Sequence, residues 1–241
     1  MREMDQARTL RALQDADLAI LRAKSRYDNL PEKAQLATVR KKVHEVLVKQ
    51  GQVSDLKAEC EDRIEACQKE IEDLDRKISE KQRELDSTSN HRLIAGLTKD
   101  MEGAVKRREK VDFQMNEHLA RLEKIEAVEA QVKAAAAKLD AAESGLAAFV
   151  AAQAEEMHRV VSESQELHRT YAAELDKDLL ERYLHLARTK GGVGVADFAD
   201  DRCSACNLEF HEGERQRIAR GPAISTCPRC GRLLIRDAGE E

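Results

Sequence analysis

Four cysteines near the C-terminus carry the strongest chemical signal of the chain. Cys203 and Cys206 form one C-x2-C pair, Cys227 and Cys230 form a second, and residues 207–226 separate the two pairs. Each pair places two thiolates on one tight turn, and the intervening segment is long enough to form strands that bring the turns together. This spacing predicts one tetrahedral Zn²⁺ per chain, held by the four cysteines. A redox dithiol and a disulfide pair are the rival interpretations.

The composition of the second turn supports the zinc interpretation. Pro228 fixes φ inside the turn, and Gly231 directly after it can take the positive φ that lets backbone N–H groups reach the sulfurs. Four protein ligands close the coordination sphere and leave no open position to activate water. We therefore expect a structural zinc site and no enzymatic activity.

Arginines crowd the same module, and they allow two interpretations. They form a patch for nucleic-acid phosphates or for an acidic protein face, or they are solvated charges balanced by nearby carboxylates. The candidates for a binding patch are Arg215, Arg217, Arg220, Arg229 and Arg232.

The overall composition is that of long helices. Of the 241 residues, 36% are charged and 3% are aromatic, so the chain cannot fill a large globular core. The net charge is −5, which means that any nucleic-acid surface must be local. The N-terminus has no apolar stretch of a signal peptide, and no segment is apolar enough to span a membrane. We expect a cytoplasmic protein, where reduced thiols favour a zinc site over disulfides.

Two long apolar seams follow one another along the chain. From Leu36 to Leu85, and again from Ile94 to Tyr171, seam residues alternate three and four positions apart, which predicts a coiled coil. Cys60 and Cys67 fall on the first seam seven residues apart, where a thiol packs as a small apolar group. The second seam includes His118 and Leu167. The first seam has a polar residue at Lys57, and the second has one at Glu129.

Turn residues divide this helical body. Residues 86–90 join the seams into an antiparallel hairpin, with the turn near 87–91. A separate first helix ends at the break Leu30-Pro31, where the chain kinks or folds back; the similar lengths on either side of the turn favour a kink. Glycines at 191–194 end the last helix and form a hinge. We predict a mainly α fold: residues 1–190 form a long antiparallel coiled-coil hairpin, and residues 191–241 form a small β zinc ribbon.

Short apolar runs supply the strands of the ribbon. The runs that can pair around the metal are residues 193–198, 208–210, 223–225 and 233–235.

These features together resemble the bacterial family of coiled-coil proteins with a C-terminal C4-type zinc ribbon. The resemblance covers the whole length, and the cysteine frame with the Cys-Pro-x-Cys-Gly-Arg ending is its specific part. The matching residues are Leu10-x2-Leu13-x3-Asp17, Leu30-Pro31, Leu179-Leu180-x2-Tyr183-x2-Leu186, Cys203-x2-Cys206 and Cys227-Pro228-x-Cys230-Gly231-Arg232-x-Leu234.

The resemblance implies a helical hairpin carrying a ribbon that binds zinc through its four cysteines. Relatives include a flagellar regulator that binds an RNA-polymerase sigma factor and a messenger RNA, a member linked to type III secretion, and others assigned to nucleic-acid binding. Two functions follow as expectations. The first is a non-enzymatic adaptor that binds a protein partner, such as a factor of the transcription machinery. The alternative is a regulator that binds RNA or DNA through the ribbon arginines. A monomeric hairpin is favoured.

Overall fold

The computed structural model describes residues 2–236, which form a mainly helical chain with a small C-terminal sheet, and the predicted fold class is confirmed. The helices are α1 (Arg2–Asp28), α2 (Pro31–Ser87), α3 (His91–Glu174), α4 (Lys177–Thr189) and α5 (Glu212–Arg220). The strands are β1 (Val195–Ala199), β2 (Arg202–Cys203), β3 (Ile224–Thr226) and β4 (Leu233–Arg236). Contacts divide the chain into two units. One is Ala34–Ala147, and the other joins the residues up to Lys33 to those from Ala148 onward.

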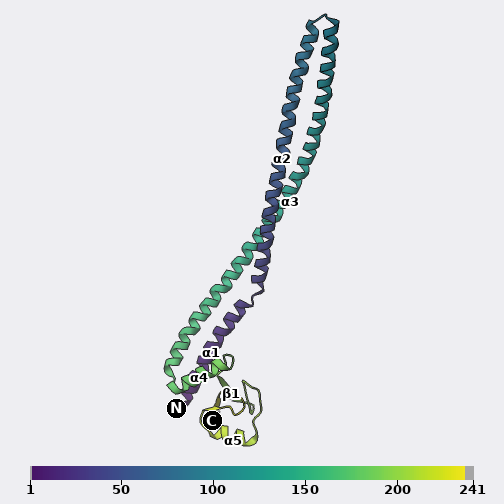
Figure 1. Cartoon of the computed structure of the whole chain (residues 1–241). Coiled ribbons are helices and arrows are strands. Elements are labelled where there is room, and N and C mark those ends of the chain that lie inside the picture. Colours follow the sequence, from purple (N-terminus) through teal and green to yellow (C-terminus); the bar gives the residue numbers. More distant parts are fainter. Residues whose placement is uncertain (1, 237–241) are drawn as a thin grey trace. The chain divides into compact units, whose positions relative to one another are not determined.

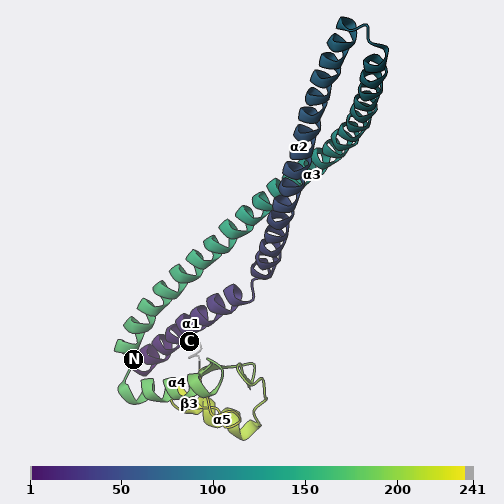
Figure 2. The same cartoon turned by 45° about the horizontal axis from the view of Figure 1, so that its top comes forward.

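In the Ala34–Ala147 unit, α2 and the first part of α3 form the antiparallel hairpin that the seams predict (Figure 1, Figure 2). Ion pairs between α2 and α3 join earlier residues of α2 to later residues of α3, as an antiparallel arrangement requires. Arg40 Nε lies 2.9 Å from Glu143 Oε1, and Lys57 Nζ lies 3.2 Å from Glu129 Oε2. The last pair explains why both seams tolerate a polar residue at this level, since each side chain neutralises the other.

Cys60 packs as the seam predicts. Its side chain is 3% exposed, and its Sγ lies 3.2 Å from the backbone oxygen of His118. At the hairpin turn, the side chain of Asn90 caps α3, because its Oδ1 accepts the N–H of Arg92 at 3.0 Å. The turn therefore ends one helix and begins the next through local side-chain chemistry.

In the other unit, α1 lies against the last part of α3. The two helices run in opposite directions: Gln6 Nε2 donates to the backbone oxygen of Glu174, and Asp17 meets His168. Leu10 and Leu13 of α1 are fully buried in a core shared with Tyr183 of α4. Tyr171 and Ala172 of α3 pack against the same core, so these apolar contacts join α1 to α3 and α4.

One predicted seam position is wrong at this end of α3. Leu167 is 46% exposed, and the neighbouring His168 faces α1 instead, with its Nδ1 2.7 Å from Asp17 Oδ1. The polar Asp17 on α1 explains the difference, because a histidine satisfies a half-buried carboxylate and a leucine does not.

The ribbon is a four-stranded sheet in the order β2-β1-β4-β3. Strand β1 pairs with β4 in parallel, and the other pairs are antiparallel. Three of the predicted runs correspond to β1, β3 and β4. The run at 208–210 is not a strand, since it makes only an isolated bridge from Glu209 to Arg202. Helix α5 follows it and was not predicted. At the start of α5 the Glu214 carboxylate accepts the N–H of His211 at 3.0 Å, and the N–H of Glu214 donates to the carbonyl of His211 at 2.9 Å.

Candidate metal centre

Two turns of the same construction hold the four cysteines. In the first turn the N–H of Asn207 donates to the carbonyl of Cys203 at 2.8 Å, and in the second the N–H of Gly231 donates to the carbonyl of Cys227 at 2.9 Å. Both donors have positive φ, 59° for Asn207 and 78° for Gly231. The positive φ predicted for Gly231 is confirmed. The role of Asn207 was missed, although asparagine is the residue that most readily replaces glycine in this conformation.

The four sulfurs lie together. All Sγ atoms are within 4.8 Å of one another, and the contacts between the turns, Cys203 to Cys230 and Cys206 to Cys227, are 4.0 Å each. A disulfide needs about 2.05 Å between sulfurs. Tetrahedral thiolates on a metal at about 2.3 Å lie roughly 3.8 Å apart. The spacing therefore suits four ligands of one metal ion, and the four cysteines could hold it.

The surroundings of Cys203, Cys227 and Cys230 shift the pKa values of their thiols in different directions. Burial raises the pKa of Cys203 to about 12 and also raises the pKa of Cys227. Burial opposes ionisation of Cys230 as well, but hydrogen bonds from the backbone and side chain of Arg232 lower its pKa to about 7. Buried thiols of this kind ionise together only when a cation compensates the charge.

Arg232 also fastens the hinge that leads into the ribbon. Its Nε donates to the carbonyl of Val193 at 2.7 Å, and its guanidinium also reaches the carbonyl of Lys190. The hinge glycines end α4 as predicted, with φ of 69° at Gly191 and 89° at Gly192. One arginine thus connects the hinge to the second cysteine turn.

The other candidate arginines fall into two groups. Arg215 lies 2.6 Å from Asp201 and also pairs with Glu212, while Arg229 lies 3.1 Å from Glu214. These two guanidinium groups are neutralised within the ribbon.

The second group is Arg217 and Arg220, at the end of α5. Both are exposed, and within residues 2–236 neither makes an ion pair. Of the five candidates, these two are exposed and make no ion pair among the described residues.

Helix α1 holds the ribbon through contacts that the sequence did not reveal. Gln14 binds the backbone of Val195 twice: its Nε2 donates to the carbonyl at 3.0 Å, and its Oε1 accepts the N–H at 2.6 Å. Arg11 lies 2.6 Å from Asp197 on the same strand. The ribbon is therefore joined to α1 by paired hydrogen bonds and a salt bridge.

A partly buried polar cluster of Asp17, His168 and Tyr183 ties α1 to α3 and α4. The hydroxyl of Tyr183, which is fully buried, donates to Asp17 Oδ2 at 2.6 Å, while Oδ1 of the same carboxylate meets His168. Burial raises the pKa of Tyr183, and the hydrogen bond to Asp17 raises it further. Asp17 and Tyr183, which lie far apart in the sequence, belong to this one cluster.

With this geometry in place, the comparisons identify the family. The family model of the CT398-like coiled coil hairpin domain matches residues 13–191. The chain belongs to this family. A search of curated proteins gave no match. Among residues 2–236, no helix combines the length and apolar content that crossing a membrane requires.

Solved structures show the same fold. A structure from Mycobacterium smegmatis is 21% identical, with a TM-score of 0.77 over 98% of this chain and 99% of the other. CT398 from Chlamydia trachomatis is 18% identical, with a TM-score of 0.59 over 98% and 99% of the two chains. The HP0958 protein from Helicobacter pylori is 12% identical, with a TM-score of 0.51 over 97% and 98%. At these identities the likeness concerns the fold.

Proposed function

We propose that the protein is a non-catalytic adaptor of the coiled-coil hairpin family, whose ribbon is held by one Zn²⁺ on Cys203, Cys206, Cys227 and Cys230. The observation that carries the proposal is the set of four sulfurs within 4.8 Å of one another. An all-thiolate donor set favours zinc over hard cations. Bound zinc would link the two turns and supply much of the folding free energy of this small module. The reduced thiols that it needs suit the cytoplasm.

The closed donor set is the reason for proposing a non-catalytic role. A catalytic zinc keeps one position for water or substrate, whereas four cysteines occupy all four positions. Cys203 is fully buried and Cys227 is 1% exposed, so a substrate has little access to these sulfurs. The site stabilises the ribbon, and the adaptor uses the surfaces around it.

A protein partner fits these surfaces better than nucleic acid does. Phosphate binding draws on several uncompensated cations, and carboxylates already occupy Arg215 and Arg229. A factor of the transcription machinery is the partner class that the family resemblance favours. Nucleic-acid binding is the second candidate, and the exposed Arg217 and Arg220 support it.

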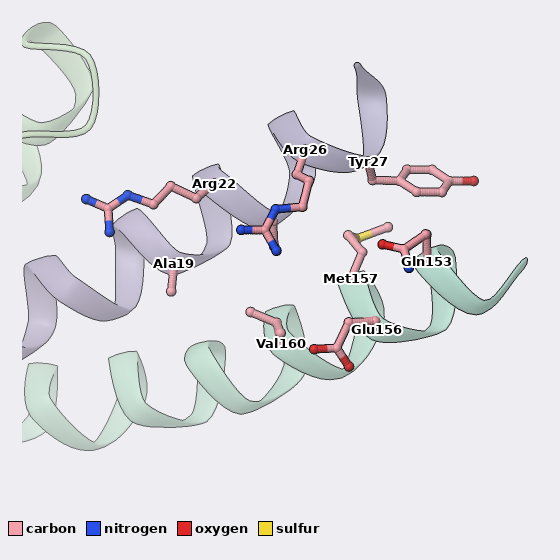
Figure 3. Close-up of a pocket in the computed structure, with 9 residues that line it drawn as sticks. Ala19, Arg22, Arg26, Tyr27, Gln153, Glu156, Met157 and Val160 are labelled. Carbon is pink, nitrogen blue, oxygen red and sulfur yellow. The ribbon is translucent and has the colours of Figure 1, made fainter. Parts of the chain in front are cut away.

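A groove between α1 and α3 adds a surface suited to a protein. It has a volume of about 250 Å³ and an apolar floor that includes Ala19, Met157 and Val160, with Arg22 and Arg26 beside it. Figure 3 shows Met157 and Val160 on α3 facing α1 across the groove. Apolar area bordered by charge is typical of protein contact sites.

Affinity capture on the full zinc-loaded chain, with and without nuclease, tests the adaptor. We expect the same proteins to be recovered in both arms, directly cross-linked to the chain. Recovery of proteins only without nuclease would contradict the adaptor. The nucleic-acid alternative predicts binding to RNA or DNA that weakens steeply with salt and fails when Arg217 and Arg220 are replaced by Ala. A matched Arg217→Lys and Arg220→Lys variant keeps both charges and serves as the control.

A further inference from the structure

Strand β3 forms an edge of the ribbon sheet, and no strand among residues 2–236 pairs with its outer side. In the antiparallel pair with β4, the carbonyl of Ala223 accepts the N–H of Arg236, and the N–H of Cys227 donates to the carbonyl of Arg232. Alternate residues of an antiparallel strand face opposite ways. The N–H and C=O groups of Ile224 and Thr226 therefore point away from β4, towards the open edge.

A groove runs beside this edge on the face that α5 covers. Its volume is about 280 Å³, and Ile218, Pro222 and Pro228 form apolar parts of its wall. Ser225 also lines the groove, and its small side chain leaves space where a larger residue would fill it. An added strand on β3 would direct alternate side chains into this space.

The charge at the groove favours an acidic ligand. Arg217 lines the groove and is exposed, without an ion-pair partner in residues 2–236. Glu214 also lines the groove, but Arg229 lies 3.1 Å from it. The pKa of Glu214 is lowered first by its hydrogen bond from the His211 backbone and then by the nearby charges of Arg229 and Arg217, so Arg217 lies near this carboxylate without forming an ion pair with it.

We propose that the β3 edge binds an extended segment of a protein partner. The segment adds a strand through Ile224 and Thr226, places a bulky apolar side chain in the α5 groove, and presents a carboxylate to Arg217. This inference rests on the proposed adaptor function and names one of its binding sites. Main-chain hydrogen bonds supply affinity in this mode, and the groove with its arginine supplies selectivity.

A second copy of this chain and nucleic acid are the other possible occupants. A second copy would offer its own Ile224–Thr226 edge, which carries no carboxylate to meet Arg217. Single-stranded nucleic acid binds by stacking bases on aromatic side chains, and no aromatic residue lines the groove among the described residues. A peptide uses both features present here, the open backbone and the apolar groove.

The experiment selects peptides from a displayed library of random nine-residue sequences on the full zinc-loaded chain. Recovered sequences are synthesised and their Kd values measured. The decisive variant is Thr226→Pro, which removes an outward N–H, and Thr226→Val is the matched control that keeps it. We expect Kd to rise about tenfold for Thr226→Pro and to stay unchanged for Thr226→Val. Arg217→Glu should weaken acidic peptides by at least about tenfold, and Arg217→Lys much less.

Two measurements keep the test valid if Thr226→Pro disturbs folding. Zinc content and the slow amide exchange of Leu234 report whether the variant ribbon is intact. In the unaltered chain, the amides of Ile224 and Thr226 should exchange rapidly when free and become protected when peptide binds. Failure to recover any peptide, or recovery of peptides that leave these two amides unprotected, overturns the proposal. So does a dimer of this chain that the Thr226→Pro variant dissociates.

The result separates this inference from the adaptor function. If Thr226→Pro, with its ribbon intact, captures the same nuclease-resistant partners as the unaltered chain, the edge inference fails and the adaptor stands. If selected peptides protect Ile224 and Thr226 but no nuclease-resistant partner is captured, the edge stands and the adaptor fails.

Discussion

Replacing Tyr183 by Phe tests whether the partly buried polar cluster stabilises the unit that carries the ribbon. The substitution removes one hydroxyl and keeps the ring, so it opens no large cavity around this fully buried side chain. It leaves Asp17 Oδ2 without the donor that lies 2.6 Å away, while Oδ1 keeps its contact with His168. The expected effect is therefore that of one lost hydrogen bond to a carboxylate.

The size of the stability loss depends on how exposed Asp17, the hydrogen-bond partner of Tyr183, is to water. A hydrogen bond to a charged group contributes about 1.5–3 kcal/mol. The side chain of Asp17 is 21% exposed, so water can replace part of the lost interaction. We therefore expect the free energy of unfolding of this unit to fall by about 1.5 kcal/mol, at the lower end of that range.

Native-state hydrogen exchange of α4 amides measures this change without requiring the whole chain to unfold at once. Asp17→Ala and the double variant complete a cycle, in which we expect a coupling energy of about 1–2 kcal/mol. Leu21→Ala, on the 45% exposed Leu21 of α1, is the control for unspecific loosening. A loss below about 0.5 kcal/mol for Tyr183→Phe, with no coupling, would refute the reasoning.

The Tyr183 hydroxyl also makes the stability of this unit depend on pH. Burial and the contact with Asp17 raise the pKa of Tyr183 in the folded state above its ordinary value of 10.0. The unfolded chain therefore loses this proton first as pH rises, and the hydroxyl's contribution is complete below pH 10 and declines above it. The stability advantage over Tyr183→Phe should shrink by about 1.4 kcal/mol per pH unit above pH 10. The difference in the free energy of unfolding between the two chains is measured by amide exchange at pH 8 and by denaturant unfolding at pH 11. The same difference at both pH values would contradict this assignment.

Three further predictions concern the metal centre and the two apolar interfaces. Cys227→Ser should reduce bound zinc from one per chain to well below it and remove the thiolate absorption of the cobalt-substituted protein; full zinc retention would contradict a four-cysteine site. Leu13→Ala, at a fully buried position, should lower the free energy of unfolding by about 2–5 kcal/mol in denaturant titrations, compared with less than about 0.5 kcal/mol for the exposed Leu21→Ala. Cys60→Ala should cost about 1 kcal/mol and Cys67→Ala less, because Cys60 is 3% exposed and Cys67, at the next equivalent seam position, is only partly buried; equal costs would contradict this difference in burial.

The features that the sequence predicted correctly are local ones. The alternation of three and four residues follows from the geometry of two supercoiled helices, so it marks Leu36, Cys60 and Val111 as buried without knowledge of the partner. The pairing of cysteines two by two, and the glycine after the second turn, likewise report on a few consecutive residues. The helix α5 escaped prediction because its start depends on His211, an uncommon N-cap.

The sequence by itself determined the helical hairpin, its seams and the four-cysteine frame, because period and spacing are properties of neighbouring residues. Tertiary structure alone decided that Asp17 meets Tyr183 and His168, that Gln14 holds Val195, and that acids of the ribbon neutralise Arg215. Hydrogen bonds and ion pairs between such distant residues need a match of position and charge across separate elements. No repeat along the chain encodes that match, and it appears only when the helices and the ribbon pack together.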